Sequence, residues 1–187
     1  MMVAAAAWLV AACAQHVMAE QSYLIYQSTH PQLPIRFEYP QGWHVEESEG
    51  STEAYTQVQV FGPGSLEGRM HTFLAVRAVP PRTHGGRYAS VDELVESYRR
   101  TLMPTLAINR ERRQVLLDAP ATVLEVRGIL YLPWKAADPQ PVPIQSQRVF
   151  FEKDGRLYEL SWIATPETAD ALAAAFDHLL QTLTVTR

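Results

Sequence analysis

The sequence predicts an α+β domain in which an antiparallel β-sheet is flanked by helices, in an α/β/α sandwich. Two segments have the apolar spacing of amphipathic helices, and runs of strand-like alternation lie between them. A late strand-like segment, Arg156–Ala164, is apolar on both sides, with Tyr158, Leu160 and Trp162 on one side and Leu157 on the other. Such a strand has to be covered on both faces, so we expect the two helices on opposite sides of the sheet.

The first strands follow one another closely. Residues 35–39 alternate between apolar and charged side chains, which is typical of a half-buried strand. The Pro and Gly of residues 40–42 predict a turn, after which Trp43 and Val45 are expected to point inward and His44 outward. Further strands are expected at residues 55–61, 72–79, 113–117, 122–132, 145–152, 156–164 and 184–186.

Both helices have clear start signals. Ser90 stands three residues before Glu93, which is the spacing of a capping box, and Pro104 ends the apolar stripe that follows. The second helix begins with Thr165 as N-cap and Pro166 at the first helical position. The buried stripes are predicted to be Val91, Leu94, Val95, Tyr98 and Leu102 in the first helix and Leu172, Phe176, Leu179, Leu180 and Leu183 in the second.

The charge of the chain is mild and unevenly distributed. A formal net charge of −4 over 187 residues argues against a nucleic-acid-binding surface, which concentrates positive charge on one face. Residues 37–68 contain six glutamates and no basic residue, whereas five arginines lie close together between Arg99 and Arg113. The two segments either contact each other, mark a docking face or form ordinary solvated surfaces.

Residues 1–14 form an uncharged apolar run that is too short to span a membrane comfortably but has the length of a signal-peptide core. One interpretation is a signal peptide of residues 1–19, which ends in a small residue suited to signal peptidase. The other is a lipoprotein leader of residues 1–12, because the four residues that end at Cys13 resemble a bacterial lipobox in which this cysteine is lipidated. Both interpretations predict export.

The segment FEYPQGW at residues 37–43 resembles the opening strand–turn–strand of the PsbP-like family, which includes an extrinsic lumenal protein of photosystem II and exported bacterial relatives. Residues 158–185 are similar to the closing strand, helix and short strand of that family, and the helix at Ser90 falls where the family has its first long helix. The resemblance implies a PsbP-like domain at residues 34–187, after a connecting segment at 20–33. It implies a non-catalytic accessory or binding role and assigns no site residue.

The sequence contains no recognisable nucleophile or phosphate-binding motif, so we predict no catalytic residue and no cofactor. Among candidate metal ligands, His44 and Glu46 project from the same side of one strand, and His71 could approach them across the sheet. The alternative is that these are exposed polar side chains. A metal-dependent hydrolase built on them is the least favoured function, because a functional site needs a convergent polar cluster.

Residues 133–143 contain four prolines and are expected to form a loop. Trp134 in this loop and Tyr131 just before it form the predicted binding surface, because loops held on a rigid sheet often carry recognition. The alternative is that Trp134 folds back over the edge of the sheet.

Together, these features predict an exported accessory protein that binds an unknown protein partner or a membrane-associated complex. Its expected location is the periplasm or cell envelope, and its only expected contact with a membrane is a lipid anchor on Cys13, if the lipoprotein interpretation holds. The alternative function is a small-ligand carrier that uses a cleft between sheet and helix.

Overall fold

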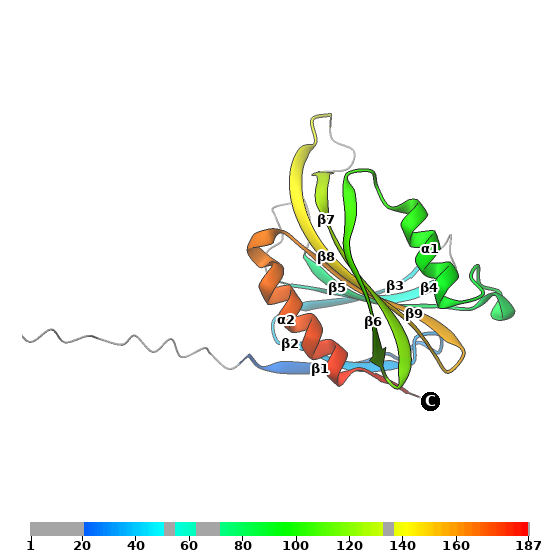
Figure 1. Ribbon diagram of the computed structural model, residues 1–187. Helices are drawn as coiled ribbons and strands as arrows, with labels where there is room; N and C mark the ends of the chain where they lie inside the picture. The colour runs from blue at the N-terminus through cyan, green and yellow to red at the C-terminus, as the bar shows by residue number, and fades with distance from the viewer. Residues whose placement is uncertain (1–20, 51–54, 63–71, 133–136, 187) are drawn as a thin grey trace, which may run out of the picture.

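The computed structural model describes residues 21–50, 55–62, 72–132 and 137–186. Its largest element is a twisted, seven-stranded antiparallel sheet with the strand order β3-β4-β5-β9-β8-β7-β6 (Figure 1). The predicted leader, Cys13, His71 and Trp134 lie outside the described residues. The strands of this sheet are β3 (His44–Gly50), β4 (Tyr55–Phe61), β5 (Phe73–Val79), β6 (Leu106–Leu116), β7 (Ala119–Leu132), β8 (Gln140–Lys153) and β9 (Arg156–Ala164).

A second, three-stranded antiparallel sheet brings together the two ends of the described chain. Its strands, in the order β1-β2-β10, are β1 (Tyr23–Gln27), β2 (Ile35–Pro40) and β10 (Thr184–Val185). The helices are α1 (Val91–Thr101) and α2 (Pro166–Thr182), and the 3-10 turn η1 (Arg82–His84) precedes α1. In the part of the chain that the structure describes, neither helix is long and apolar enough to cross a membrane.

One face of the large sheet is closed by α2 and the small sheet, which form a single covering layer. Leu160 and Trp162 of β9 are buried there, with 6% of Trp162 exposed, and they belong to the same apolar core as Phe37 of β2 and Phe176 of α2. Trp43 packs partly buried against this core. The inward direction predicted for Trp162 is therefore confirmed.

The opposite face of the large sheet carries α1. Leu94 and Val95 of this helix pack against Phe150 of β8 and Leu157 of β9, in a second apolar cluster. Alternate residues of β9 thus belong to different cores, which confirms the prediction of a strand buried on both sides. The helix begins as predicted, because the Ser90 hydroxyl accepts a hydrogen bond from the Glu93 backbone N–H at 3.3 Å.

The structure adds strand β1 within a segment that was expected only to connect the leader to the domain. Tyr26 of this strand packs its ring 4.9 Å from that of Phe37, and Tyr23 stacks 3.6 Å from the ring of His178 on α2. Leu24 and Ile25 are both exposed, so two adjacent apolar residues mask the alternation by which a strand is recognised.

Three strand starts were also predicted too late, and the difference is smallest for β7, which begins at Ala119 rather than at residue 122. β6 begins at Leu106 rather than at residue 113, because a register shift between Ile108 and Arg110 interrupts its alternation. β8 begins at Gln140, inside the stretch predicted as a loop, although it contains two prolines. Before Gln145, β8 pairs with β7 but not with β9, and an edge tolerates proline because no second neighbour needs its missing N–H.

The acidic and basic segments do not contact each other through their strands. β3, which carries Glu46, Glu47 and Glu49, and β6, which carries Arg110 and Arg112, are the two edge strands at opposite ends of the large sheet. Charged side chains on an edge strand discourage pairing with another sheet. The charge segregation seen in the sequence therefore becomes a difference between two edges of one sheet.

Candidate functional site

The candidate metal ligands are only partly brought together. His44 and Glu46 lie on the same face of β3, with 3.1 Å between His44 Nε2 and Glu46 Oε1, and both side chains are largely exposed. The third candidate, His71, lies outside the described residues. Among the described residues, no three His, Cys, Asp or Glu side chains are close enough together to hold a metal ion.

Tyr131 of the predicted binding surface lies on the long hairpin formed by β7 and β8, which extends beyond the neighbouring strands (Figure 1). It is 48% exposed, and Ile129, two residues earlier on the same side of the strand, is 41% exposed. Their cross-strand neighbours are Pro143 opposite Ile129 and Pro141 opposite Tyr131, both exposed. We call these four residues the hairpin ribbon.

The other side of the same hairpin is buried. Leu130, Leu132, Val142 and Ile144 form a small apolar cluster of their own. This cluster holds the hairpin in place, so the hairpin ribbon is an exposed apolar surface on a firmly packed support.

A charged cluster that sequence reasoning missed lies on the face of the sheet that carries α1. Glu159 of β9 is only 6% exposed and lies between Arg77 of β5 and Arg148 of β8. Arg77 Nη1 donates to Glu159 Oε2 at 3.1 Å, and Arg148 Nη1 donates to Glu159 Oε1. We call these three residues the arginine–glutamate cluster. Because β9 lies between β5 and β8, the sheet places one guanidinium on each side of the carboxylate.

Each guanidinium of the cluster also contacts an aromatic ring. Arg77 Cζ lies 4.1 Å from the centre of the Tyr55 ring, and Arg148 Cζ lies 4.4 Å from that of Tyr98 on α1. Cation–π contacts of this kind fix the plane of each guanidinium. Burial raises the pKa of the Tyr98 hydroxyl, so this ring stays neutral at physiological pH.

Arg148 is held in its charged form despite its position. Burial alone lowers the pKa of a guanidinium, but the Glu159 carboxylate and Tyr98 outweigh this effect, and the pKa of Arg148 is raised. The buried Nε of Arg148 has no hydrogen-bond partner within the described part of the chain. The cluster therefore contains two permanent positive charges, one carboxylate and a donor that is not used.

A hollow of about 130 Å³ adjoins the cluster on the open side of the sheet. The polar residues of its wall are the two arginines and the carboxylate together with two glutamines and a serine, and the remainder is apolar. The lining residues are Gln57, Gln59, Phe73, Ala75, Arg77, Arg148, Glu159 and Ser161. Tyr98 of α1 contacts the cluster at Arg148, and the hollow beside that contact is lined by all three charged groups.

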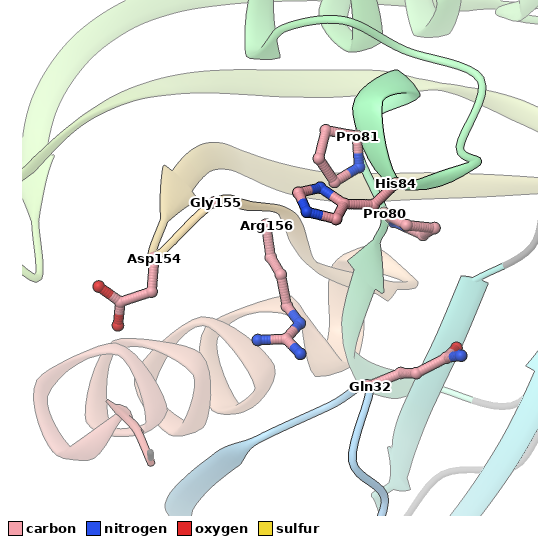
Figure 2. A pocket seen from close by; sticks show the side chains of 7 residues that line it. All are labelled: Gln32, Pro80, Pro81, His84, Asp154, Gly155 and Arg156. Atoms are coloured by element: carbon pink, nitrogen blue, oxygen red, sulfur yellow. The ribbon is translucent and has the colours of Figure 1, made fainter.

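A larger hollow, of about 260 Å³, lies where the turn between β8 and β9 approaches η1 (Figure 2). The Arg156 side chain enters it, but Nη2 of Arg156 donates to the carbonyl of Pro31 at 3.2 Å. His84 Nδ1 pairs with the Thr83 hydroxyl at 3.2 Å, and Figure 2 shows the Asp154 carboxylate directed away from the other side chains. Arg156 and His84 bind groups of neighbouring loops, and the polar side chains do not converge on a common point. This hollow is therefore the weaker candidate for a site.

No protein-family model matches the sequence, and no curated protein matches it. Solved structures do share its architecture. Cyanobacterial PsbP (CyanoP) from Synechocystis sp. PCC 6803, known from a solution structure, is similar with a TM-score of 0.56 at 14% identity, over 90% of this chain and 95% of that one. The chain has the PsbP-like fold. LpqN of Mycobacterium tuberculosis, which is involved in cell envelope biogenesis, is similar with a TM-score of 0.53 at 12% identity, over 90% of this chain and 93% of LpqN.

Within this PsbP-like fold, the two surfaces described above face opposite ways. Ile129 and Tyr131 occupy odd positions of β7, whereas Leu124, on the face that carries α1, occupies an even one. The hairpin ribbon therefore belongs to the side of α2, and the arginine–glutamate cluster belongs to the side of α1. A substitution in one surface can be made without touching the other.

Proposed function

We propose that this protein is an exported, non-catalytic accessory protein that docks on a partner protein through the hairpin ribbon. The proposal rests on the contrast in burial between the two sides of the β7–β8 hairpin. Its inner side is buried in an apolar cluster, while Ile129 and Tyr131 on its outer side are 41% and 48% exposed. Exposed apolar residues that gather on a rigid element mark interaction surfaces more often than scattered ones do.

The composition of the hairpin ribbon suits contact with a protein. Tyrosine supplies a large amphipathic contact area and loses little conformational entropy when it binds. Pro141 and Pro143 have no backbone N–H group that a partner would have to satisfy, and they stiffen the edge. A rigid surface of this kind favours binding because less conformational freedom is lost on association.

Export is supported by the apolar leader predicted for residues 1–19. Similarity to CyanoP and to LpqN, a protein involved in cell envelope biogenesis, is compatible with the same location. We propose the periplasm or cell envelope, where the partner is a protein or a membrane-associated complex. Whether the chain is also anchored by a lipid depends on Cys13.

A non-catalytic role is supported by the arrangement of the candidate metal ligands. His44 and Glu46 are 70% and 58% exposed, so water competes for both groups. A catalytic metal site instead holds its ligands firmly, with a second shell of hydrogen bonds. The pair is therefore better explained as part of the solvated surface of β3.

A photo-crosslinking amino acid at position 131 tests the docking surface. We expect it to capture one discrete partner in envelope extracts, because the side chain lies in the interface. The same amino acid at Val115, which is 74% exposed on β6, is the matched control and should capture nothing specific. Identical product patterns from the two positions would contradict docking through the hairpin ribbon.

Determination of the N-terminus of the mature protein tests whether the chain is exported. We expect protein from envelope fractions to begin either at Glu20 or at a lipid-modified Cys13, because each interpretation of the leader names one cleavage site. Recovery of the uncleaved chain from the cytosol alone would contradict export.

A further inference from the structure

We propose that the hollow beside Arg77 and Arg148 binds a small monocarboxylate. This inference does not depend on docking through the hairpin ribbon, because the hollow lies on the opposite face of the sheet. It rests on the charge of the arginine–glutamate cluster, on the donors that the cluster presents and on the size of the recess.

The charge of the cluster matches a single negative charge. Arg77 and Arg148 contribute two positive charges, and the Glu159 carboxylate that both contact contributes one negative charge. Among the described residues, these three groups leave one positive charge in excess beside the hollow. A monocarboxylate would balance it, whereas a phosphate group, with a charge of roughly −1.5 to −2 at neutral pH, would overcompensate it.

The geometry of the donors also suits a carboxylate. Arg77 Nη2 reaches the side-chain Oε1 of Gln57 only at 3.5 Å, so it remains available to a stronger acceptor. The side chains of Arg148 and Arg77 are 26% and 27% exposed, and both line the hollow. A guanidinium presents parallel donors that fit the two oxygens of a carboxylate. Because Tyr55 and Tyr98 already hold these groups, little freedom is lost on binding.

The size of the hollow limits the ligand to a few heavy atoms beyond its carboxylate. Its volume of about 130 Å³ exceeds the roughly 10–15 Å³ that one water requires and falls below the about 300 Å³ at which pockets for drug-sized ligands begin. Phe73 and Ala75 offer an apolar wall for a short carbon chain. Gln57, Gln59 and Ser161 offer amide and hydroxyl groups for a second polar group of the ligand.

Titration of the isotope-labelled full chain with N-acetylglycine at constant ionic strength, followed by nuclear magnetic resonance, tests the proposal. We expect saturable shifts of backbone amides in β4, β5 and β9 around the hollow. The neutral analogue N-acetylglycinamide should cause none, because it lacks the carboxylate. Shifts that do not saturate, equal binding of the neutral analogue, or tighter binding of inorganic phosphate would each overturn the proposal.

Two variants locate the binding in the hollow. Arg77→Gln should weaken binding of N-acetylglycine at least about tenfold, because a charge-assisted hydrogen bond is lost. Its control, Arg127→Gln, removes the same charge from an exposed position on the opposite face and should leave the affinity unchanged.

Ala75→Val keeps every charge and adds two methyl groups to the wall of the hollow, so it should also weaken binding at least about tenfold. This variant decides the question if Arg77→Gln does not fold. Unchanged affinity in Ala75→Val would show that the ligand binds elsewhere, and the proposal would fail.

Discussion

The two faces of the seven-stranded sheet are built on different principles. On the face under α2, neighbouring strands contribute Val60, Leu74 and Trp162, and the covering layer leaves each of them 6% exposed or less. On the face under α1, the same three strands carry the polar and charged residues Gln57, Arg77 and Glu159, besides the apolar residues that pack against the helix.

This difference indicates that the face under α2 mainly stabilises the fold, whereas the face under α1 also carries charged groups that a ligand can reach. Strand β9 serves both, because Leu160 enters the core while the preceding residue, Glu159, enters the arginine–glutamate cluster. Apolar burial contributes roughly 25 cal/mol per Å², so the closed face supplies most of the stability. The open face is then free to hold charged groups that a ligand can reach.

Truncation of a large side chain on the closed face should have the largest effect on stability. We expect Trp162→Ala to lower the free energy of unfolding by about 3–5 kcal/mol, because it opens a cavity in the core and removes the hydrogen bond from Trp162 Nε1 to Gln147 Oε1. Urea unfolding measures the change. Val115→Ala, at a 74% exposed position, is the control and should stay within about 0.5 kcal/mol of the wild type. Equal effects of the two substitutions would refute a closed core at Trp162.

Loss of the central carboxylate on the open face should have a smaller effect. We expect Glu159→Gln to lower the free energy of unfolding by about 2–3 kcal/mol, because two guanidiniums lose the charge that they share, while their partial exposure lets water compensate in part. Glu125→Gln is the matched control on the other face. Its contacts with Arg110 and Arg112 are 3.9 Å long and more exposed, so the expected change is at most about 0.5 kcal/mol. Similar losses in both variants would mean that the cluster has no special role.

Removal of the N-cap of α1 tests how much the start of this helix contributes to the stability of the fold. We expect Ser90→Ala to cost about 1 kcal/mol, since one backbone N–H at the start of the helix loses its acceptor. Thermal unfolding of this variant beside Thr165→Ala gives the comparison. Thr165 is also an N-cap, but its side chain makes no capping hydrogen bond, so its replacement should cost less. The reverse order would contradict these cap assignments.

The smallest expected effect depends on pH and involves the same cap. The Ala89 backbone N–H, followed by Arg82, stabilises the charged form of Glu93 and lowers the pKa of this carboxyl. A carboxyl whose pKa is lowered in the folded state stabilises the protein above its ordinary pKa and loses this contribution as the pH falls. We therefore expect Glu93→Gln to be less stable than the wild type at neutral pH, with a difference that shrinks in acid. A difference that grows on acidification would contradict this account.

The closed face was largely predictable from the sequence, because local patterns determine it. The alternation around Trp162, the cap at Ser90 and the proline at position 166 each predicted an element that the structure confirms. The late start assigned to β6 shows the limit of this approach, because a register shift breaks the period on which the pattern depends.

The arginine–glutamate cluster was not predictable in the same way. Glu159 gave one signal, since a carboxylate within a strand buried on both faces requires a partner. Its partners come from β5 and β8, which lie 82 and 11 positions away along the chain. The sequence does not reveal the strand order that brings these three side chains together. Tyr131 was predicted as part of a binding surface; the structure shows that it is exposed, and the packed hairpin that supports it became visible only there.

The division between the two faces is tested most directly by the rise in melting temperature that N-acetylglycine causes in three proteins. A ligand that binds only the folded state raises the melting temperature according to its affinity. We predict the same rise in the wild type and in Trp162→Phe, which alters the face under α2, and a much smaller rise in Arg77→Gln, which alters the face under α1. An undiminished rise in Arg77→Gln, or the loss of the rise in Trp162→Phe, would contradict the separation of stability and binding between the two faces.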